Sequence, residues 1–281
     1  MNETAFTKLH GIGNDFVVVD NLDSRSRFSE ERVREICDRH FGIGADGLIL
    51  AEASQLADVK MVFFNSDGSL AQMCGNGIRC LGKFLRDKAL ITSRRIRVET
   101  GAGIKVVTIH DEAGADGFFA TVEMGRPAFQ CSAIAVAHED EEMINERIEV
   151  LPGEGGAVTC VSMGNPHAVF FVDSVAEAPV QRWGAAMQSS PLFPEHTNVE
   201  FVQVIDEKTI QLRVFERGVG ETLACGTGAC AAAVAAAKLD LTGRQVDVLL
   251  PGGKLSVEWS TSGVVYMTGP ATTVFEGSII I

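Results

Sequence analysis

Two cysteines in this sequence stand directly before a Gly-x-Gly run. Cys74 begins Cys-Gly-Asn-Gly and Cys225 begins Cys-Gly-Thr-Gly, and each run leads into a segment with helical character. A thiol at a helix N-terminus lies near the positive end of the helix dipole and near unpaired N–H groups, which favours its thiolate. The glycines let a ligand approach these amides, which readily bind a carboxylate or a phosphate. The pattern therefore predicts two reactive thiols, each beside an anion site.

Other functions of these motifs fit the spacing less well. Neither run ends in Gly-Lys-Ser/Thr, as a phosphate loop would. Cys74 and Cys80, like Cys225 and Cys230, lack the Cys-x-x-Cys spacing of a zinc knuckle or a dithiol oxidoreductase. A non-enzymatic redox or metal-binding module stays open as an alternative, and metal content and thiol titration would distinguish it. The remaining cysteines are interpreted as inert core residues: Cys37, Cys131 and Cys160, with Cys80 and Cys230 on the helix bodies.

The segments around the two motifs form an internal repeat. Three pairs of segments share an offset of 151 residues: Gly13-Asn14 with Gly164-Asn165, residues 62–65 with 213–216, and residues 74–77 with 225–228. Several element types at one spacing indicate a duplicated domain rather than chance likeness between Gly-rich loops. Each half predicts strand, turn, strand, Cys-Gly-x-Gly turn, helix and further strands. We expect buried strands over 16–19 and 168–172, and helices over 78–90 and 229–241.

The repeat also predicts the domain organisation. We expect an N-terminal domain over 1–128 and a C-terminal domain over 129–270, with the segment 271–281 able to pack back on the first. The acidic run and the Gly- and Pro-rich stretch within 137–156 indicate the crossover between them. Two similar domains commonly place a shared site in the cleft between them.

Paired thiols from a duplicated domain suit one kind of chemistry in particular. Inverting a stereocentre requires one group to remove a proton from one face of a carbon and another to deliver a proton to the opposite face. The reverse reaction uses the same pair in exchanged roles. The repeat therefore favours a two-base racemase or epimerase with Cys74 and Cys225 as the two groups.

The composition limits the partners of the protein. The chain has 281 residues, and its 24 Lys and Arg against 37 Asp and Glu give a net charge of -13. This balance disfavours nucleic acid and anionic membrane surfaces. No apolar stretch approaches the roughly 20 residues that span a bilayer. The odd number of cysteines, seven, indicates free thiols in a reducing compartment, and we expect a soluble cytoplasmic protein.

Seven motifs in order relate the sequence to a known family. They are residues 10–16 (His-Gly-Ile-Gly-Asn-Asp-Phe), 64–68 (Phe-Asn-Ser-Asp-Gly), 73–80 (around Cys74), 164–167 (Gly-Asn-Pro-His), 197–201 (Thr-Asn-Val-Glu-Phe), 216–218 (Glu-Arg-Gly) and 224–228 (around Cys225). Through them the sequence resembles the diaminopimelate epimerase family over essentially its whole length. The resemblance implies an α+β fold of two pseudo-symmetric domains, each a mixed, largely antiparallel barrel-like sheet around a central helix. It further implies a homodimer without pyridoxal phosphate, other cofactor or metal.

The resemblance also implies a reaction and a set of site residues. The reaction is the interconversion of LL-2,6-diaminopimelate and its meso form, in the biosynthesis of lysine and peptidoglycan precursors. Cys74 and Cys225 would be the base and the acid, and His167 and Glu216 would assist them. The substrate would be bound by the amides of Gly75, Asn76, Gly226 and Thr227 and by Asn14, Asn65, Asn165, Asn198, Glu216 and Arg217.

Simpler interpretations exist for several of these residues. Glu216 and Arg217 could form a surface ion pair, and the asparagines could serve only to make turns. One position departs from the family pattern, because many members carry Gln where this chain has Gly47, the repeat partner of Asn198. Proline and hydroxyproline racemases share the two-cysteine architecture, but they do not need the distal Arg and Asn set. A histidine racemase is a further alternative, for which we would expect apolar or aromatic residues at several distal positions. The Arg and Asn set favours diaminopimelate.

Overall fold

The chain folds into two compact units that are joined by two strands. The computed structural model describes residues 3–111 and 117–280. One unit comprises residues 1–123 with 268–281, and the other comprises 124–267. The chain leaves the first unit in β8 (Phe118–Gly125) and returns in β17 (Val265–Ile280). The units thus divide at 123/124 and 267/268, close to the divisions at 128/129 and 270/271 that the repeat predicts.

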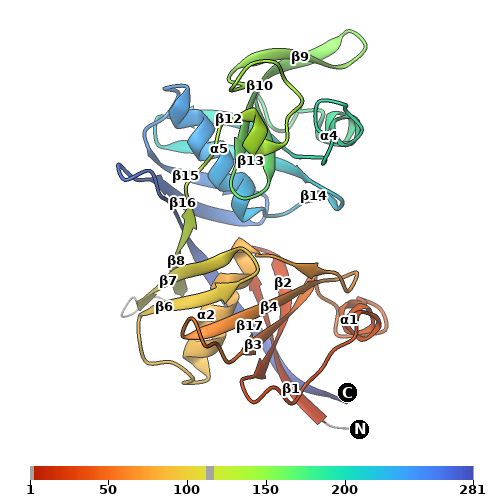
Figure 1. Cartoon of the computed structure of the whole chain (residues 1–281), viewed down its shortest axis with the longest axis vertical. Helices are drawn as coiled ribbons and strands as arrows, with labels where there is room; N and C mark the ends of the chain where they lie inside the picture. Colours follow the sequence, from red (N-terminus) through yellow and green to blue (C-terminus); the bar gives the residue numbers. More distant parts are fainter. Residues whose placement is uncertain (1–2, 112–116, 281) are drawn as a thin grey trace. The chain divides into compact units, whose positions relative to one another are not determined.

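The first unit is a mixed sheet that flanks one long helix (Figure 1). Its strands pair in the order β17, β1, β2, β3, β4, β6, β7 and β8. The β2–β3 and β4–β6 pairs are parallel, and the other neighbouring strands in this order are antiparallel. The helix α2 packs against β1, β2, β3 and β7. The elements before β8 are β1 (Glu3–Gly11), β2 (Asn14–Asn21), α1 (Glu30–Cys37), β3 (Gly47–Glu52), β4 (Val59–Asn65), β5 (Leu70–Ala71), α2 (Gly75–Asp87), β6 (Arg95–Thr100) and β7 (Gly103–Asp111).

The second unit repeats this ladder. Its strands pair as β9, β10, β11, β12, β13, β15 and β16, and the β11–β12 and β13–β15 pairs are the parallel ones. The α+β fold with a duplicated domain is thereby confirmed. The elements are α3 (Cys131–Ile134), β9 (Glu146–Leu151), β10 (Glu154–Ser162), β11 (Pro166–Phe171), α4 (Val180–Gln188), β12 (Asn198–Asp206), β13 (Thr209–Glu216), β14 (Gly220–Thr222), α5 (Gly226–Lys238), β15 (Gln245–Leu250) and β16 (Gly253–Trp259).

Both long helices begin earlier than the sequence predicts. α2 starts at Gly75 and α5 at Gly226, so each Gly-x-Gly run, expected to be a turn, forms the first helical turn. Glycine has a low helix propensity, but a capping side chain can compensate for it by satisfying a terminal N–H. The body of α5 is almost entirely alanine and buried, which lets the surrounding strands approach the helix closely. In both helices the Gly-x-Gly run is thus the first helical turn, capped by the preceding cysteine.

The predicted crossover at 137–156 is wrong, because this stretch lies inside the second unit. Its Gly- and Pro-rich part is the tight turn of the β9–β10 hairpin, where Gly153 has a φ of +76° that favours glycine. Its acidic part is tied to the same unit, since the Cys131 N–H donates to the Glu141 carbonyl at 2.8 Å. The chain changes units in an extended strand, which leaves no Gly- or Pro-rich signal in the sequence.

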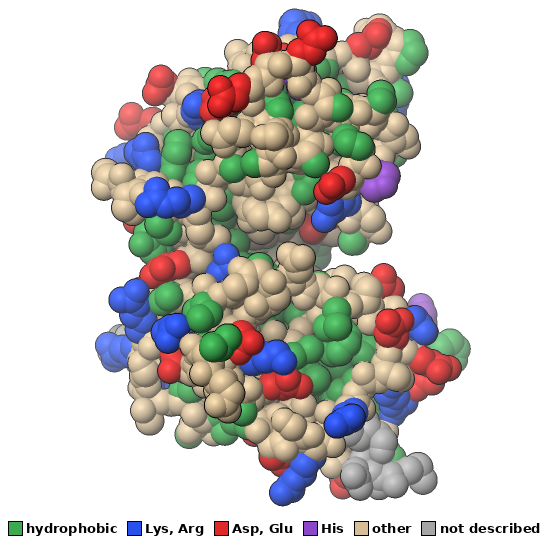
Figure 2. Space-filling model, viewed as in Figure 1, with side chains coloured by type: hydrophobic (Ala, Val, Ile, Leu, Met, Phe, Trp, Pro, Cys, Tyr) green, Lys and Arg blue, Asp and Glu red, His purple; other side chains and the backbone are tan. Residues whose placement is uncertain are grey.

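The C-terminal half of β17 pairs with the first strand of the chain. Residues from Thr272 to Ile280 run antiparallel to β1, with one register shift between Lys8 and Leu9. Within the described residues, no helix combines the length and the apolar character needed to cross a membrane. On the face drawn in Figure 2, acidic and basic side chains are interspersed.

Candidate functional site

Each predicted catalytic cysteine caps the N-terminus of a long helix. Cys74 has extended backbone angles (φ -135°, ψ 121°) before α2, and its sulfur accepts the Gly77 N–H at 3.4 Å. Cys225 has nearly the same angles (φ -120°, ψ 114°) before α5, and its sulfur accepts the Gly228 N–H at 3.3 Å. Both sulfurs therefore lie where unpaired amides and the helix dipole favour negative charge. Cys74 is partly exposed, whereas Cys225 is 4% exposed.

The amide side chains of Asn14 and Asn76 meet beside Cys74. Asn14 opens β2 after the Ile12-Gly13 turn, in which both residues have positive φ. Its Oδ1 accepts from Asn76 Nδ2 at 3.1 Å and from the Cys74 thiol at 3.7 Å. We call these three residues, with Arg79 and Asp46, the first half-site.

Charged groups lie at both ends of the Asn14–Asn76 pair. Arg79, on α2, is fully buried and donates to Asn76 Oδ1 at 2.9 Å and to the Gly75 carbonyl at 3.0 Å. Asp46, in the loop before β3, accepts from Asn14 Nδ2 at 2.7 Å. Arg39 joins Asp46 to Asp15 with contacts of 2.7 Å to each carboxylate. The first half-site is thus a neutral amide pair held between a buried cation and a carboxylate.

A buried salt bridge supports the Asp46 end. Lys8 is 5% exposed and lies 2.5 Å from Asp15. Burial would raise the pKa of Asp15, but hydrogen bonds from Arg39 and Lys8 outweigh it and hold that pKa well below its usual range. Asp15 is therefore ionised at any physiological pH.

Around Cys225 the same backbone carries different side chains. Asn165, the repeat partner of Asn14, donates from Nδ2 to Thr227 Oγ1 at 3.3 Å. The Thr227 hydroxyl lies 3.6 Å from the Cys225 sulfur. We call these three residues, with His167, Glu200 and Glu216, the second half-site.

A fully buried histidine–glutamate pair lies behind Asn165. His167 Nδ1 is 2.7 Å from Glu200 Oε1, and His167 Nε2 is 3.0 Å from Asn165 Oδ1. Both imidazole nitrogens thus have an oxygen partner. The pair has 0% exposure on both residues, so these contacts replace the water that the two side chains lose on burial.

Glu216 adds a second carboxyl group beside Cys225. It accepts from the Thr222 hydroxyl at 2.5 Å and from Cys225, and burial raises its pKa. Burial raises the pKa of the Cys225 thiol well above its usual value, with the Glu216 and Glu200 carboxyls adding to the effect. The Thr227 hydroxyl and the Gly228 N–H oppose the shift without cancelling it. Cys225 is therefore a thiol at neutral pH, although its helix terminus alone predicts a favoured thiolate.

The remaining predicted substrate residues lie at strand ends. Asn198, at the start of β12, donates to the Pro166 carbonyl at 2.8 Å and accepts the Arg217 N–H at 3.0 Å, so it fixes the turn that carries Arg217. The Arg217 guanidinium donates to the Glu195 carbonyl at 3.1 Å. Asn65, at the exposed end of β4, donates to Ser69 Oγ at 3.0 Å. Arg217 and Glu216 are not an ion pair with each other among the described contacts.

Gly47 has no room for a side chain. It pairs with Asn65 in the β3–β4 ladder, and a Cβ built on it would lie 2.4 Å from the Phe64 carbonyl oxygen and 2.5 Å from the Phe63 ring. The equivalent residue of the second half, Asn198, makes two hydrogen bonds. The space that a longer side chain would need at position 47 is therefore taken by backbone and by an aromatic ring.

Three charged residues of the half-sites are absent from the sequence-based set: Arg79, Asp46 and Glu200. Arg79 and Glu200 interrupt otherwise apolar buried runs, and a charge at such a position is a signal that could have identified them. Asp46 has no such signal, since it lies in a polar loop and meets Asn14 only through the fold.

The other cysteines are buried. Burial raises the pKa of Cys37 to about 11 and that of Cys80 to about 12. A raised pKa makes a thiol a poor nucleophile at neutral pH. These positions fit their interpretation as core residues.

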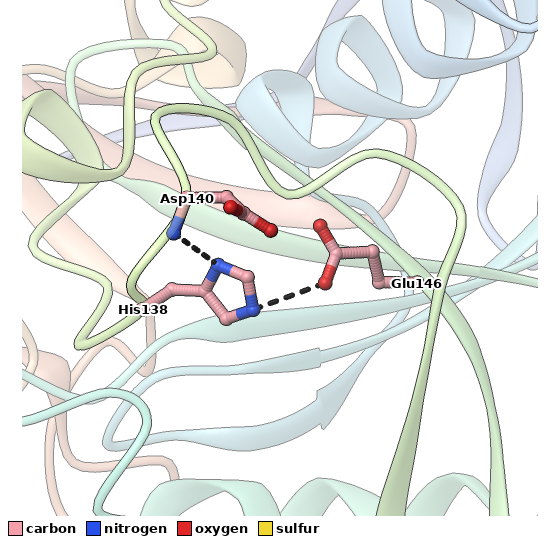
Figure 3. A group of neighbouring side chains, drawn as sticks. All are labelled: His138, Asp140 and Glu146. Atoms are coloured by element: carbon pink, nitrogen blue, oxygen red, sulfur yellow. Dashed lines mark hydrogen bonds and ion pairs between the residues drawn. The ribbon is translucent and has the colours of Figure 1, made fainter.

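One group of side chains, His138, Asp140 and Glu146, has the donor types of a metal site (Figure 3). The Asp140 N–H donates to His138 Nδ1 at 3.2 Å, which puts the imidazole proton on Nε2, 3.0 Å from Glu146 Oε2. A metal at Nε2 would force that proton onto Nδ1, opposite the Asp140 N–H. Both imidazole nitrogens of His138 therefore have hydrogen-bond partners already, which does not suit a metal ligand.

The fold is one that solved structures of other proteins share. A hydroxyproline epimerase from Agrobacterium vitis is similar over 99% of this chain and 91% of its own, with a TM-score of 0.71 and 14% identity. A phenazine biosynthesis protein of the PhzF family from Bacillus anthracis matches over the whole of both chains, with a TM-score of 0.72 and 18% identity. Similarity at these identities shows the fold alone.

The sequence matches define the protein as an epimerase and place it within one family. The family model described as diaminopimelate epimerase matches residues 6–130 and 159–274. Diaminopimelate epimerases from Methanococcus maripaludis strain C6 and from Acetivibrio thermocellus are each 48% identical to this chain and cover 98% of it; the match takes in 99% and 98% of their own lengths. The chain therefore belongs to the diaminopimelate epimerase family, and the resemblance seen in its sequence motifs is confirmed.

Proposed function

We propose that the protein interconverts LL-2,6-diaminopimelate and meso-diaminopimelate by a two-base mechanism in which Cys74 and Cys225 act on opposite faces of one α-carbon. The observation that supports it best is the matched geometry of the two thiols. Each thiol caps the central helix of its half of the duplicated chain, and a Gly-x-Gly run forms the first turn of that helix. A single-base enzyme would have no use for this match.

The reaction needs one thiolate and one thiol. The thiolate removes the α-proton, which leaves an electron pair on the carbon, and the other thiol delivers its proton to the opposite face. The first cysteine ends as a thiol and the second as a thiolate, so the reverse reaction uses the same pair in exchanged roles. Holding both sulfurs beside the carbon makes neither transfer diffusional.

The developing carbanion requires electrostatic help, because the α-proton of a zwitterionic amino acid is very weakly acidic. We assign this role to the amides of Gly75, Asn76, Gly226 and Thr227, which lie in the first turns of α2 and α5. Such amides bind the reacting carboxylate and stabilise negative charge as it forms, more effectively where water is excluded.

The protonation of Cys225 suits it to deliver a proton. Its raised pKa keeps it a thiol in the protein without substrate. A substrate ammonium group beside Glu216 would offset that carboxylate and make the Cys225 thiolate more accessible in the reverse direction. His167, which donates to Asn165, would assist by orienting the substrate at this thiol.

The distal part of the substrate would be held by polar residues at strand ends. Arg217 can pair with a carboxylate through two parallel hydrogen bonds, and Asn198 fixes the backbone from which it projects. Asn14, Asn65 and Asn165 would bind the remaining amino and carboxyl groups. We further propose that the enzyme is a cytoplasmic homodimer that acts in lysine and peptidoglycan precursor biosynthesis without pyridoxal phosphate, as the family resemblance implies.

Proton NMR of LL-diaminopimelate in deuterium oxide tests the proposal. Reduced protein without pyridoxal phosphate should cause loss of the α-proton signal together with formation of the meso isomer. Absence of exchange under reducing conditions would contradict the proposal and would bring proline, hydroxyproline and histidine forward as substrates. The assay contains reductant throughout, so that both cysteines stay reduced.

A further inference from the structure

A continuous chain of hydrogen bonds runs through the first half-site. Arg79 donates to Asn76 Oδ1 at 2.9 Å, Asn76 donates from Nδ2 to Asn14 Oδ1 at 3.1 Å, and Asn14 donates from Nδ2 to Asp46 Oδ2 at 2.7 Å. The chain joins α2, the start of β2 and the loop before β3. It includes two residues of the predicted site and two that the sequence did not suggest.

The two ends of this chain set its direction. A guanidinium can only donate, so the Asn76 atom that faces Arg79 must be the amide oxygen. An ionised carboxylate can only accept, so the Asn14 atom that faces Asp46 must be the amide nitrogen. Each asparagine then has one remaining orientation, and the Asn14 oxygen must face Asn76 and Cys74. The side-chain amides cannot flip without leaving a charged group unsatisfied.

This orientation matters for the thiol. The Asn14 oxygen lies 3.7 Å from the Cys74 sulfur, where it can accept a hydrogen bond from a thiol but cannot stabilise a thiolate. The amide nitrogen in its place would favour the thiolate, because hydrogen bonds to a charged form stabilise it. In the second half-site the sulfur instead faces the Thr227 hydroxyl, which, unlike an amide oxygen, can donate as well as accept.

We propose that Asp46 and Arg79 are positioning residues, which fix the Asn14 amide with its oxygen toward Cys74 and so hold this sulfur as a hydrogen-bonding thiol until substrate arrives. The role rests on the proposed function of Cys74 as a catalytic acid/base. The charged groups around Asn14 and Cys74 are Asp46, Asp15, Arg39, Lys8 and Arg79. They come from the loop before β3, β2, the loop after α1, β1 and α2 respectively.

The test measures the pH dependence of Cys74 alkylation by iodoacetamide in the protein without substrate, with Cys74 followed by peptide mass spectrometry. Asp46→Ala removes the acceptor, so the Asn14 amide can turn its nitrogen toward the sulfur at the cost of only one neutral hydrogen bond, that from Asn76. We expect the midpoint of alkylation to fall by about one pH unit. Asp46→Val, a second variant without an acceptor, should behave in the same way.

Two further variants separate orientation from charge. Asp46→Asn removes the negative charge but keeps an oxygen for Asn14, so it should leave the midpoint within about 0.3 pH units of the wild type. Arg39→Gln breaks the ion pairs with Asp46 and Asp15 but keeps the Asn14–Asp46 bond, and it should also leave the midpoint in place.

The outcomes decide the proposal in either direction. An unchanged midpoint in Asp46→Ala would overturn it, and so would a shift in Asp46→Asn as large as that in Asp46→Ala. In the same variants kcat for epimerisation should fall about 10-fold in Asp46→Ala and recover in Asp46→Asn. Because alkylation needs no substrate, it reports on the positioning role even if diaminopimelate proves not to be the substrate.

Discussion

The two cysteine half-sites share their backbone and differ in almost every side chain around the sulfur. Cys74 and Cys225 cap equivalent helices with similar angles and accept the equivalent N–H. Around Cys74 the neighbours are amides held between Arg79 and Asp46. The neighbours of Cys225 are titratable groups, in a buried His167–Glu200 pair and Glu216.

The difference indicates how a duplicated domain serves an asymmetric reaction. The repeated backbone gives both sulfurs the same access to helix amides, which an acid/base pair on one carbon requires. The side chains that differ place an amide oxygen beside Cys74 and carboxyl groups beside Cys225, so the surroundings of each sulfur are set separately. Geometry thus comes from the duplication, and protonation from the residues that diverged after it.

Removing either sulfur should have the largest effect. Cys74→Ala and Cys225→Ala should each lower epimerisation by about 1000-fold or more, because an acid/base group is lost from one face. The NMR assay in deuterium oxide measures this loss. Each variant should still exchange the α-proton slowly and without inversion, and only on one of the two isomers. Near-normal turnover in Cys225→Ala would refute the two-base model.

The buried pair of the second half-site should matter for stability. Glu200→Gln leaves His167 without its carboxylate partner and should lower the free energy of unfolding by about 3 kcal/mol. Urea denaturation followed by circular dichroism measures the change. The control is Asp247→Asn, which removes the exposed ion pair with Lys254 in the same unit and should cost less than about 1 kcal/mol. Equal losses in the two variants would mean that the pair has no special role.

Gly47 tests why the first half lacks a counterpart of Asn198. Gly47→Ala should lower the free energy of unfolding by about 1–3 kcal/mol, since its methyl group would collide with the Phe64 carbonyl and the Phe63 ring. Gly82→Ala is the matched control. A Cβ at this position would meet its nearest neighbours only at 3.6 Å, and alanine has a higher helix propensity than the glycine it replaces in α2. It should be neutral or stabilising, and a tolerated Gly47→Ala would show that the strand can shift to admit a side chain.

Glu216 should give the smallest effect, with a sign that depends on pH. Its pKa in the folded protein is raised by burial, so the ionised carboxylate destabilises the fold above its unfolded pKa. Glu216→Gln should therefore increase the free energy of unfolding at neutral pH. The gain should disappear as the pH falls below about 4.5, where the carboxyl is protonated in both states. A gain that persists unchanged in acid would have another cause.

Much of this arrangement could be predicted from the sequence, because the repeat is visible as matched residues at one offset. That offset alone predicts two equivalent domains and pairs Cys74 with Cys225. Local propensity misplaced the helix starts, because capping by the cysteines outweighs the low helix propensity of glycine. It also mistook the β9–β10 hairpin turn for a linker, since Gly and Pro are typical of both.

The contacts that distinguish the half-sites could not be predicted in the same way. The Arg79–Asn76–Asn14–Asp46 chain joins residues from three separated segments, and its direction depends on which atoms meet. The raised pKa of Cys225 likewise depends on burial and on carboxyls that come from other strands. Helix position alone predicted the opposite tendency for this thiol.

The source of the proton in the first turnover tests the two-base account most directly. LL-diaminopimelate would be incubated with reduced protein in deuterium oxide. The reaction would be stopped before one tenth of the LL-diaminopimelate has reacted, and the meso product and the remaining substrate would be analysed by mass spectrometry. The account predicts a product that carries one deuterium at the inverted carbon while the remaining LL substrate stays unlabelled, because the delivering thiol has exchanged with solvent. A product that retains its original proton would show that a single group both removes and returns it, and would contradict the account.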